Sequence, residues 1–393
     1  MRVLYVSHTS IVGGGERSLL DLFDALPDEV DPVLASPPGD LSAAASARGL
    51  SWYAIPGGGV SARLSLRHSP PAVARLAASA LAVRLARRRI APGIVHANSI
   101  RAGLIAAAGG PGRLVVHVRD VLPPGIAGAT AGAIVRRSAA VILGNSAYTA
   151  TRFGGNARVV RPWVDVDRFD PARIGRTEAR HRLGFPADSP LLGVVGQVTP
   201  WKGQIDAIEV LAAVRREFPS ARLLLCGSVR FEHGTRYDNR AYERALHERV
   251  RSLGLSEAVH FIGERADVEV VMRALDVLLV PSWVEPFGRV VIEGMASGLP
   301  VIATSLGGPA ELIDDGRTGL LLAPRVPEVW GRSVAALLAD RERMVAMGEA
   351  ARIRACAGFT RAAGVEAVMQ TYRELAVAAS RSTATAFGAR NSA

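Results

Sequence analysis

The stretch "PSWVEPFGRVVIEGMASGLPVIATSLGG", residues 281–308, holds the strongest local signals in the sequence. An apolar run precedes it, a Phe-Gly turn leads into a segment of small and apolar residues, and a second β-branched run follows. Strand, helix and strand in this order indicate a parallel βαβ unit. Glu285 and Glu293 lie eight positions apart in it, among apolar neighbours. If the helix begins near Gly288, both carboxylates can accept paired hydrogen bonds from the hydroxyls of one ligand.

The same alternation of strand and helix patterns runs through the chain. Short apolar runs predict strands at residues 3–6, 33–36, 94–97, 114–118, 140–144, 191–196, 222–226, 259–262, 277–280 and 301–303. Helical spacing between them predicts helices at residues 16–25, 73–89, 204–217 and 242–253. This order indicates an α/β protein whose parallel sheets are covered on both faces. In doubly wound sheets, ligands bind at the carboxyl ends of the strands, where the connections diverge.

A chain of 393 residues is about twice the size of a typical domain, which predicts two domains. The strand and helix pattern restarts after a stretch rich in charge, Pro and Asp, which favours a linker. A last helical pattern is followed by no strand and is expected to pack back on the first domain. The predicted boundaries are 1–170 for a first Rossmann-like domain, 171–188 for the linker, 189–356 for a second Rossmann-like domain, 357–379 for the returning helix and 380–393 for a flexible tail.

The formal charge of +11 arises from 47 basic and 36 acidic residues, and Lys202 is the single lysine. Because an arginine bias of this kind is typical of GC-rich bacterial genomes, the charge is weak evidence about partners. No nucleic-acid-binding motif accompanies it, so we expect no nucleic acid partner. The charge fits anionic small molecules, and it allows peripheral contact with an acidic membrane surface.

Cysteine usage and hydropathy bear on the cellular compartment. Cys226 and Cys356 cannot build a disulfide framework and lie in no metal-binding pattern, which fits a reducing cytoplasm. No apolar run is long enough for a signal peptide core or a membrane span. We therefore expect a cytoplasmic protein, with at most peripheral contact at the inner face of the membrane. The sequence does not predict an oligomeric state.

Two loops that follow predicted strands suggest phosphate binding. The first domain has three consecutive glycines at 13–15, which would let backbone amides approach a ligand at the start of a helix. A tight strand-to-helix turn explains them equally well. The corresponding loop of the second domain, "GVVGQVTPWKG" at 193–203, carries Lys202. An ammonium group there can neutralise a diphosphate leaving group, whereas a solvated surface lysine is the alternative.

The array E-P-F-G-x-V-x-x-E from Glu285 to Glu293, with A-x-G-x-P-V-I-A-T and D-G-x-T-G after it, resembles the retaining glycosyltransferase group 4 family. The GGGE loop, the K-G pair at 202–203 and the "ALDVLLVPS" segment occur in the order found in that family. The resemblance implies the GT-B fold, in which two doubly wound Rossmann-like domains face each other across a cleft and a C-terminal helix crosses back to the N-terminal domain. It makes 1–170 the acceptor domain and 189–356 the nucleotide-sugar donor domain.

The resemblance also implies roles for individual residues. Lys202 would bind phosphate, Glu285 would contact the hydroxyls of the donor sugar, and Glu293 would bind the ribose. The further donor or nucleotide contacts are Gly14, Gly15, Gln197, Gly227, Arg265, Val268, Phe287, Gly288, Arg289 and Val290, of which the amides of 288–290 would cap the diphosphate.

Two departures from the family pattern are visible. Gln197 stands where many members have an arginine that pairs with the lysine. In the first domain, "VHVRD" at 116–120 aligns with a strand end that commonly presents a histidine to the donor sugar. Either Arg119 or His117 would make that contact, and a histidine satisfied within the strand is an equal explanation for His117.

The implied reaction transfers a glycosyl group from a nucleoside diphosphate sugar to an acceptor hydroxyl, with retention at the anomeric carbon. A UDP-sugar is favoured over GDP-mannose, and the acceptor would be a glycan, a glycolipid or a small molecule. No cofactor or metal is expected, because Lys202 and helix-start amides would stabilise the leaving diphosphate. The alternatives are a GT-B phosphorylase or epimerase and a non-catalytic binder of nucleotide sugars or glycans. A dehydrogenase is disfavoured because the glycine loop lacks dinucleotide spacing.

Overall fold

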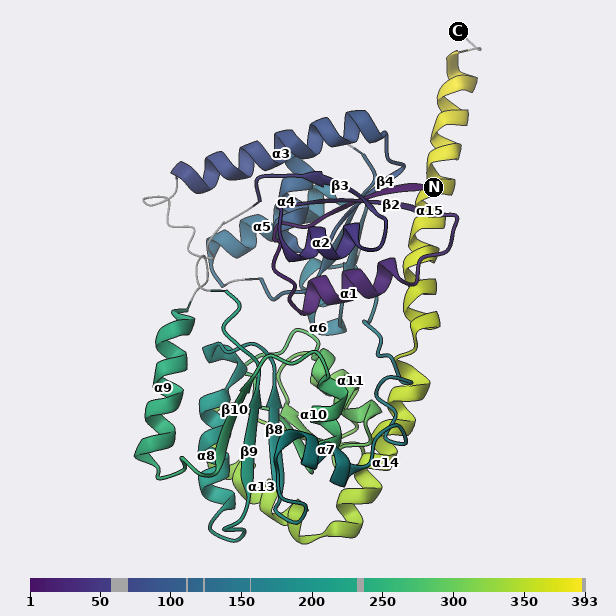
Figure 1. Ribbon diagram of the computed structural model, residues 1–393. Helices are drawn as coiled ribbons and strands as arrows, with labels where there is room; N and C mark the ends of the chain where they lie inside the picture. Colours follow the sequence, from purple (N-terminus) through teal and green to yellow (C-terminus); the bar gives the residue numbers. More distant parts are fainter. Residues whose placement is uncertain (58–69, 111, 123, 156, 232–236, 391–393) are drawn as a thin grey trace. The chain divides into compact units, whose positions relative to one another are not determined.

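The computed structural model describes residues 1–57, 70–110, 112–122, 124–155, 157–231 and 237–390. The chain forms two compact units (Figure 1). Unit 1 comprises Met1–Arg161 together with Arg361–Ala393, and unit 2 comprises Pro162–Thr360. Each unit contains one parallel sheet with helices on both faces, which confirms the predicted α/β class.

Within the described residues, unit 1 holds a seven-stranded sheet in the order β3-β2-β1-β4-β5-β6-β7. Its strands are β1 (Arg2–Val6), β2 (Asp31–Ser36), β3 (Ser51–Ala54), β4 (Ile94–Ala97), β5 (Leu114–Val118), β6 (Val141–Gly144) and β7 (Ala157–Val159). Its helices are α1 (Gly14–Phe23), α2 (Asp40–Ser46), α3 (Pro70–Ile90), α4 (Ile100–Ala108), α5 (Ile126–Ser138), α6 (Ala147–Ala150), the 3₁₀ helix η1 (Thr151–Phe153) and α15 (Arg361–Arg390). The strand order reverses between β1 and β4, so the loops that follow these two strands flank the expected ligand position.

Helix α15 belongs to unit 1 although most of the chain separates it from the other elements of that unit. The hydroxyl of the fully buried Tyr372 donates a hydrogen bond to the Tyr5 hydroxyl of β1 at 3.0 Å. It also lies 2.6 Å from Nδ1 of His96 on β4. These contacts dock the helix on the sheet, as expected for the returning helix.

The end of α15 differs from the predicted flexible tail at 380–393. The helix continues to Arg390, and 391–393 lie outside the described residues.

Unit 2 holds a six-stranded sheet in the order β10-β9-β8-β11-β12-β13 within the described residues. Its strands are β8 (Leu191–Val195), β9 (Arg222–Cys226), β10 (Val259–Gly263), β11 (Val277–Val280), β12 (Val301–Thr304) and β13 (Leu320–Leu322). Its helices are α7 (Arg176–Leu183), the 3₁₀ helix η2 (Pro200–Lys202), α8 (Gln204–Val214), α9 (Asn239–Ser252), α10 (Val268–Ala274), α11 (Arg289–Ala296), α12 (Pro309–Leu312), α13 (Pro327–Ala339) and α14 (Arg341–Gly358).

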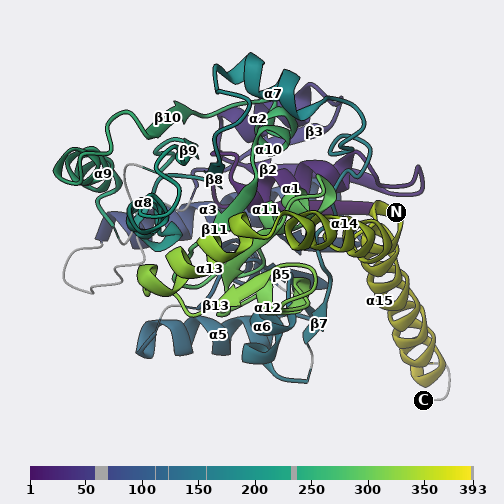
Figure 2. The ribbon, with the colours of Figure 1, turned by 90° about the horizontal axis from the view of Figure 1, so that it is seen from below.

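The core of unit 2 has two parts, one on each face of the sheet. Alternate residues of each strand point to opposite faces, so neighbours such as Leu278 and Leu279 of β11 join different clusters. Helices α8, α9 and α13 cover one face, and α7, α10, α11 and α14 cover the other (Figure 2). With both faces covered, a ligand can approach this sheet at its strand ends.

The stretch predicted as a linker, 171–188, is instead part of unit 2 and contains α7. Arg180 of this helix is 1% exposed, and its guanidinium donates hydrogen bonds to Asp276 at 2.6 Å and to the Ala274 carbonyl at 2.9 Å. The stretch therefore folds around a buried ion pair, and the chain passes between the units near 161 and again near 360.

Candidate functional site

The loops that follow β8 and β11 meet where the strand order of unit 2 reverses. From β8 the chain turns through α8 to β9, whereas from β11 it turns through α11 to β12 on the other side. The two loops are joined by a hydrogen bond between backbone groups. The backbone N–H of Trp283, after β11, donates to the backbone carbonyl of Trp201, after β8, at 2.8 Å. This is the position at which doubly wound sheets bind ligands.

Lys202 and Glu285 are paired at this point. The Lys202 ammonium donates to Oε2 of Glu285 at 2.6 Å, and the two side chains are 17% and 7% exposed. Oε2 also accepts a hydrogen bond from the Ser282 hydroxyl at 2.9 Å. The ammonium nitrogen lies 4.5 Å from the centre of the Trp201 ring, a cation–π distance. Among the described residues, none donates a hydrogen bond to Oε1 of Glu285, so this oxygen is available to a ligand.

The backbone of Glu285 is held by the loop after β12. Its N–H donates to the Leu306 carbonyl at 3.1 Å, and its carbonyl accepts from the Gly308 N–H at 2.8 Å. Gly307, at φ +106°, lies so close that a β-carbon there would be 2.0 Å from the Glu285 carbonyl oxygen. Three segments of unit 2 thus determine where this carboxylate lies.

Helix α11 begins directly after this loop, as predicted, with Gly288 as its N-cap in the left-handed conformation at φ +96°. The first N–H groups of a helix have no partner within the helix, and a helix start is a place where anions can bind. Glu293 lies one turn inside the helix and pairs with Arg289 at 3.5 Å. The Phe287 side chain lies in the apolar core, and that of Val290 packs partly against it.

Two of the predicted contacts in unit 2, Gln197 and Gly227, are held through their backbone groups. Gln197 lies just beyond β8, and its carbonyl accepts a hydrogen bond from the Gln204 side chain at 2.8 Å. Gly227 follows β9, and its N–H donates to the Gly263 carbonyl at 2.8 Å. Both therefore lie at the carboxyl ends of neighbouring strands.

The two remaining predicted contacts in unit 2 lie where α10 begins. Arg265 forms a two-pronged pair with Asp267, at 2.8 Å and 2.7 Å. Hydrogen bonding to this guanidinium lowers the pKa of the Asp267 carboxyl. Val268 is the first residue of α10 and packs against the core.

In unit 1 the structure brings Arg119 and Gly15 together. Arg119 follows β5 directly, is buried, and donates from Nε to Oδ1 of Asn98 at 2.9 Å. Asn98 in turn donates to the Gly15 carbonyl at 3.2 Å, and a β-carbon on Gly15 would lie 3.1 Å from Cδ of Arg119. Gly14 faces open space, because no heavy atom of the described residues lies within 4 Å of a β-carbon placed there.

His117 lies deeper in the sheet than Arg119. Its Nδ1 is 3.2 Å from a guanidinium nitrogen of Arg119 and must accept that hydrogen bond, because arginine only donates. Burial, and then the charge of Arg119, hold the pKa of His117 well below its usual range, so the imidazole is neutral. Its Nε2 is buried and has no hydrogen-bond partner among the described residues.

Sequence reasoning missed other polar residues at these strand ends. His8, after β1, lies 2.9 Å from the Ser99 hydroxyl, and burial lowers the pKa of His8 to about 3. Burial raises the pKa of Glu16 to about 7, although its carboxyl accepts a hydrogen bond from the Gly13 N–H at 3.2 Å. In unit 2, Ser282 and Trp201 were missed. The S-x-x-E spacing of Ser282 and Glu285 was the available signal for the former.

Two serines that follow strands of unit 1 cap helices. Ser99 accepts a hydrogen bond from the Ala102 N–H and caps α4. Ser146 accepts one from the Thr149 N–H and caps α6. In the part of the chain that the structure describes, no three His, Cys, Asp or Glu side chains are grouped as a metal site would need.

Two doubly wound α/β units in one chain are the architecture of the GT-B fold. Residues 175–354, most of unit 2, match the family described as "Glycosyl transferases group 1". The chain has the GT-B fold. The family match supports its assignment to the class of GT-B glycosyltransferases.

Curated relatives carry the name D-inositol 3-phosphate glycosyltransferase. The protein from Corynebacterium jeikeium is 35% identical over 229 residues, covering 57% of this chain and 53% of the relative. That from Kineococcus radiotolerans is 37% identical over 225 residues, covering 55% and 51%. The chain thus spans about half the length of the curated relatives it matches.

Solved structures resemble the chain over nearly its whole length. The Anabaena protein HepE in complex with UDP has a TM-score of 0.77 and 25% identity, and the match covers 95% of this chain and 100% of that one. Sucrose-phosphate synthase from Thermosynechococcus elongatus has a TM-score of 0.76 and 22% identity, with 96% and 100% covered, and supports the fold alone.

Proposed function

We propose that this chain is a retaining glycosyltransferase, of the family 4 type, that transfers a sugar from a nucleoside diphosphate sugar to an acceptor hydroxyl. The observation that carries the proposal is the pair of Lys202 and Glu285, 2.6 Å apart at the strand reversal of unit 2 and next to the start of α11. A donor of this kind presents a diphosphate and sugar hydroxyls side by side. An ammonium beside a carboxylate is complementary to both.

The proposed step breaks the bond between the anomeric carbon and the diphosphate oxygen and forms a bond from that carbon to the acceptor oxygen on the same face. The acceptor proton passes to the leaving phosphate. Lys202 and the first amides of α11 stabilise the charge that develops on the diphosphate, which is why the scheme requires no metal or other cofactor. Glu285 positions the sugar through Oε1, and no carboxylate is assigned as a nucleophile.

Two further residues complete the proposed donor site in unit 2. Glu293 would accept hydrogen bonds from the ribose hydroxyls. Arg289 lies one turn before it on the same helix face, with 22% of its side chain exposed. Because Gln197 cannot supply the positive charge that many family members have there, Arg289 is the candidate to supply it. Arg119 is the proposed donor contact from unit 1, with His117 behind it as its hydrogen-bond partner.

The donor is proposed to be a UDP-sugar. The similar protein HepE has been solved with UDP and with UDP-glucose, which favours uridine over guanosine as the base. The curated relatives are named for an inositol phosphate acceptor, which favours an acceptor that bears an anionic group.

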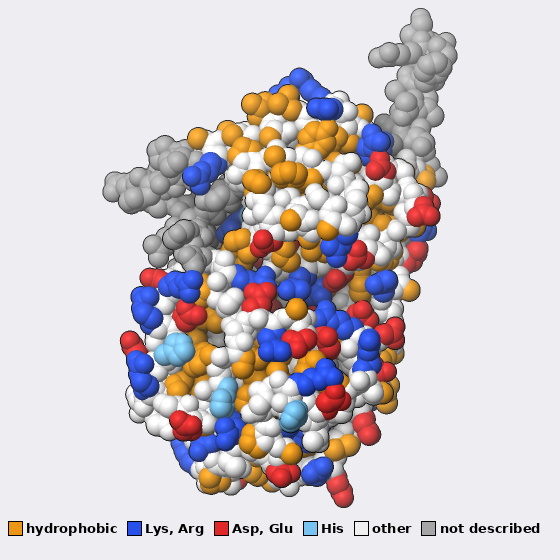
Figure 3. Space-filling model, in the orientation of Figure 1, with side chains coloured by type: hydrophobic (Ala, Val, Ile, Leu, Met, Phe, Trp, Pro, Cys, Tyr) orange, Lys and Arg blue, Asp and Glu red, His pale blue; other side chains and the backbone are white. Residues whose placement is uncertain are grey.

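The proposed location is the cytoplasm, with peripheral contact at the inner face of the membrane through α3. Its sequence contains five arginines and no acidic residue, and Leu81 and Leu85 are 57% and 54% exposed. The upper surface in Figure 3, over unit 1, displays apolar and basic side chains side by side. Such a face can rest on anionic lipids. No helix in the described residues has the length and apolarity that a membrane span requires.

The test is a thermal-shift panel with UDP, GDP, dTDP and their sugars on wild type, Lys202→Ala and Arg216→Ala. Arg216 is the control because its ion pair with Glu328 is exposed. We expect one nucleotide to stabilise wild type and Arg216→Ala, by about 2.7 kcal/mol at a hundred times its Kd, but not Lys202→Ala. Equal stabilisation of Lys202→Ala, or none of wild type, would contradict the proposal. Donor binding without nucleotide release in the presence of any acceptor would favour the non-catalytic binder.

A further inference from the structure

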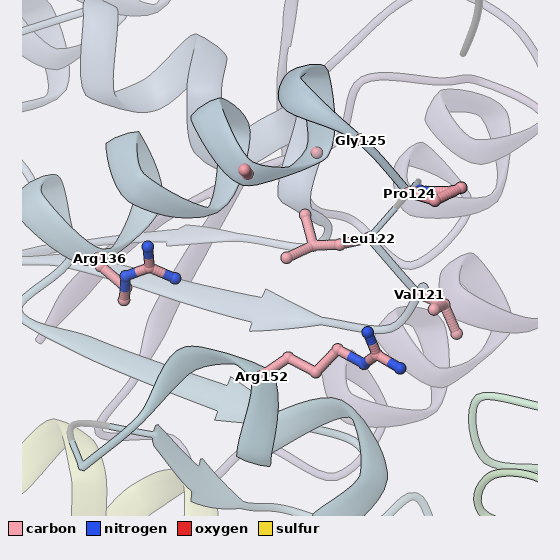
Figure 4. A pocket seen from close by; sticks show the side chains of 8 residues that line it. Val121, Leu122, Pro124, Gly125, Arg136 and Arg152 are labelled. Carbon is pink, nitrogen blue, oxygen red and sulfur yellow. The ribbon is translucent and has the colours of Figure 1, made fainter.

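Unit 1 contains a pocket of about 550 Å³ at the carboxyl ends of β5 and β6 (Figure 4). The loop after β5, helix α5 and η1 form its walls. Its side chains are mainly apolar, with two arginines among them: Val121, Leu122, Pro124, Ala129, Arg136 and Arg152. A volume of this size is typical of small-molecule sites.

Two arginines bring positive charge to this pocket. No lining residue is acidic, and within the described residues no ion pair joins Arg136 or Arg152 to a carboxylate. The Arg152 guanidinium donates to the Tyr148 hydroxyl at 3.3 Å and lies 5.4 Å from the centre of that ring. These contacts hold the group at the pocket without neutralising it. Asp120 lines a smaller adjoining cavity together with Arg152 but forms no ion pair with it in the described residues. Two guanidinium groups beside apolar walls, neither of them in an ion pair, favour an anionic ligand.

The wall that α5 contributes is nearly free of side chains. Gly125, the N-cap, and Gly128 both line the pocket, and Ala129 follows. Arg136 lies about two turns further along the same face of the helix. Figure 4 shows Leu122 projecting beneath the helix, with Arg136 to one side and Arg152 toward Val121. A ligand can therefore lie along the helix against apolar surface while an anionic group reaches an arginine.

We propose that this pocket binds the acceptor, and that the acceptor carries a phosphate or carboxylate group beside an apolar moiety. The inference rests on the proposed function, in which Lys202 and Glu285 of unit 2 recognise the donor, so that a separate anion site in unit 1 serves the second substrate. The pocket lining begins at Val121, two residues after Arg119, which follows β5 and which we assign to the donor side.

The apolar walls separate this acceptor from the one for which the curated relatives are named. An inositol phosphate presents hydroxyls all around its ring, and hydroxyls buried against Val121, Leu122 and Pro124 would lose their hydrogen bonds to water without replacement. An apolar moiety would instead gain from burial there. The acceptor proposed for this chain would thus carry an anionic group, as an inositol phosphate does, but an apolar moiety in place of the inositol ring.

The test measures binding of four probes by calorimetry: phenyl phosphate, benzoate, inorganic phosphate and D-inositol 3-phosphate. The proteins are wild type, the double variant Arg136→Gln/Arg152→Gln, and Arg137→Gln. Arg137 is the matched control because it is exposed on the same helix and lies outside the pocket lining. We expect phenyl phosphate or benzoate to bind wild type and Arg137→Gln at least about tenfold more tightly than the double variant, the loss expected for charge-assisted hydrogen bonds. The tighter of these two probes identifies the anion as phosphate or carboxylate.

Two results would overturn the inference. Binding of phenyl phosphate and benzoate that survives in the double variant would remove the role of the arginines. Binding of inorganic phosphate or inositol phosphate as tight as that of phenyl phosphate would remove the role of the apolar walls. Failure of the proposed function is a separate result, because stabilisation by UDP, GDP or dTDP depends on Lys202 and is measured without any of these probes. We expect the double variant to retain that stabilisation, which also shows that it folds.

Discussion

Replacing Gly307 by Ala should disturb Glu285 without touching its side chain. The new β-carbon would start 2.0 Å from the Glu285 carbonyl oxygen and 2.9 Å from its carbon. Real β-carbons essentially never approach closer than 3.0 Å, so the backbone of Glu285 must move by about 1 Å. The matched control is Gly316→Ala, because Gly316 has a similar left-handed φ of +78° but no heavy atom within 4 Å of a β-carbon added there.

Both substitutions carry the strain of a left-handed alanine, about 1–2 kcal/mol, and only Gly307→Ala adds a clash, worth about 1–3 kcal/mol. At about 2–4 °C per kcal/mol for a unit of this size, the Tm of Gly307→Ala should be lower than that of the control by several degrees. A displacement of 1 Å at the site should also lower donor turnover about 100-fold. The assays are thermal unfolding and nucleotide release. Equal Tm and equal turnover for the two variants would refute the inference that the close packing of Gly307 determines where Glu285 lies.

Three further predictions concern separate parts of the molecule. Ser282→Ala removes one of two hydrogen bonds to the site carboxylate and should lower donor affinity roughly fivefold, from a loss of about 1 kcal/mol, as measured by calorimetry. Burial lowers the pKa of His96 from 6.5 to about 3, so its contribution to stability is complete above pH 6.5 and is lost as the pH falls toward 3. Between these values His96→Gln should reduce the pH dependence of the unfolding free energy by about 1.4 kcal/mol per pH unit, and identical slopes in urea titrations would contradict this. Arg180→Met leaves Asp276 with Arg176 as its remaining arginine partner and takes a donor from the buried Ala274 carbonyl, and it should cost unit 2 about 3 kcal/mol. Arg182→Ala, in an exposed pair, should change the unfolding free energy little.

Much of the fold was predictable because local patterns and tertiary structure agree. The strands at β4, β5, β9 and β11 begin and end where their apolar runs do. Gly288 marks the start of α11 because the left-handed N-cap conformation favours glycine. The neighbourhood of Lys202 and Glu285 followed from their positions after strands that a doubly wound sheet places side by side.

The missed features depend on contacts between residues far apart in the sequence. The short strands β3, β7 and β13 lie toward the sheet edges and have only three or four residues each, too few for a recognisable period. The segment of α7 was predicted to be a linker because an arginine such as Arg180 is expected to face solvent. Its partner Asp276 lies 96 residues away, so the sequence pattern did not indicate the buried pair. The pocket beside α5 arises because glycines of this helix leave space next to it. In the sequence, glycines in a helix are a sign of weak helix propensity, so they did not predict a pocket.

The hydroxyl network of Tyr372 with Tyr5 and His96 also bears on how the chain is made. Unit 2 is contiguous and can fold as soon as it has left the ribosome, whereas the interior of unit 1 lacks Tyr372 until synthesis has passed through the whole of unit 2. At typical elongation rates this delay is roughly 10 to 40 s. During that time the nascent N-terminal sheet exposes the surface that α15 later covers, which makes it a natural substrate for chaperones that hold incomplete chains.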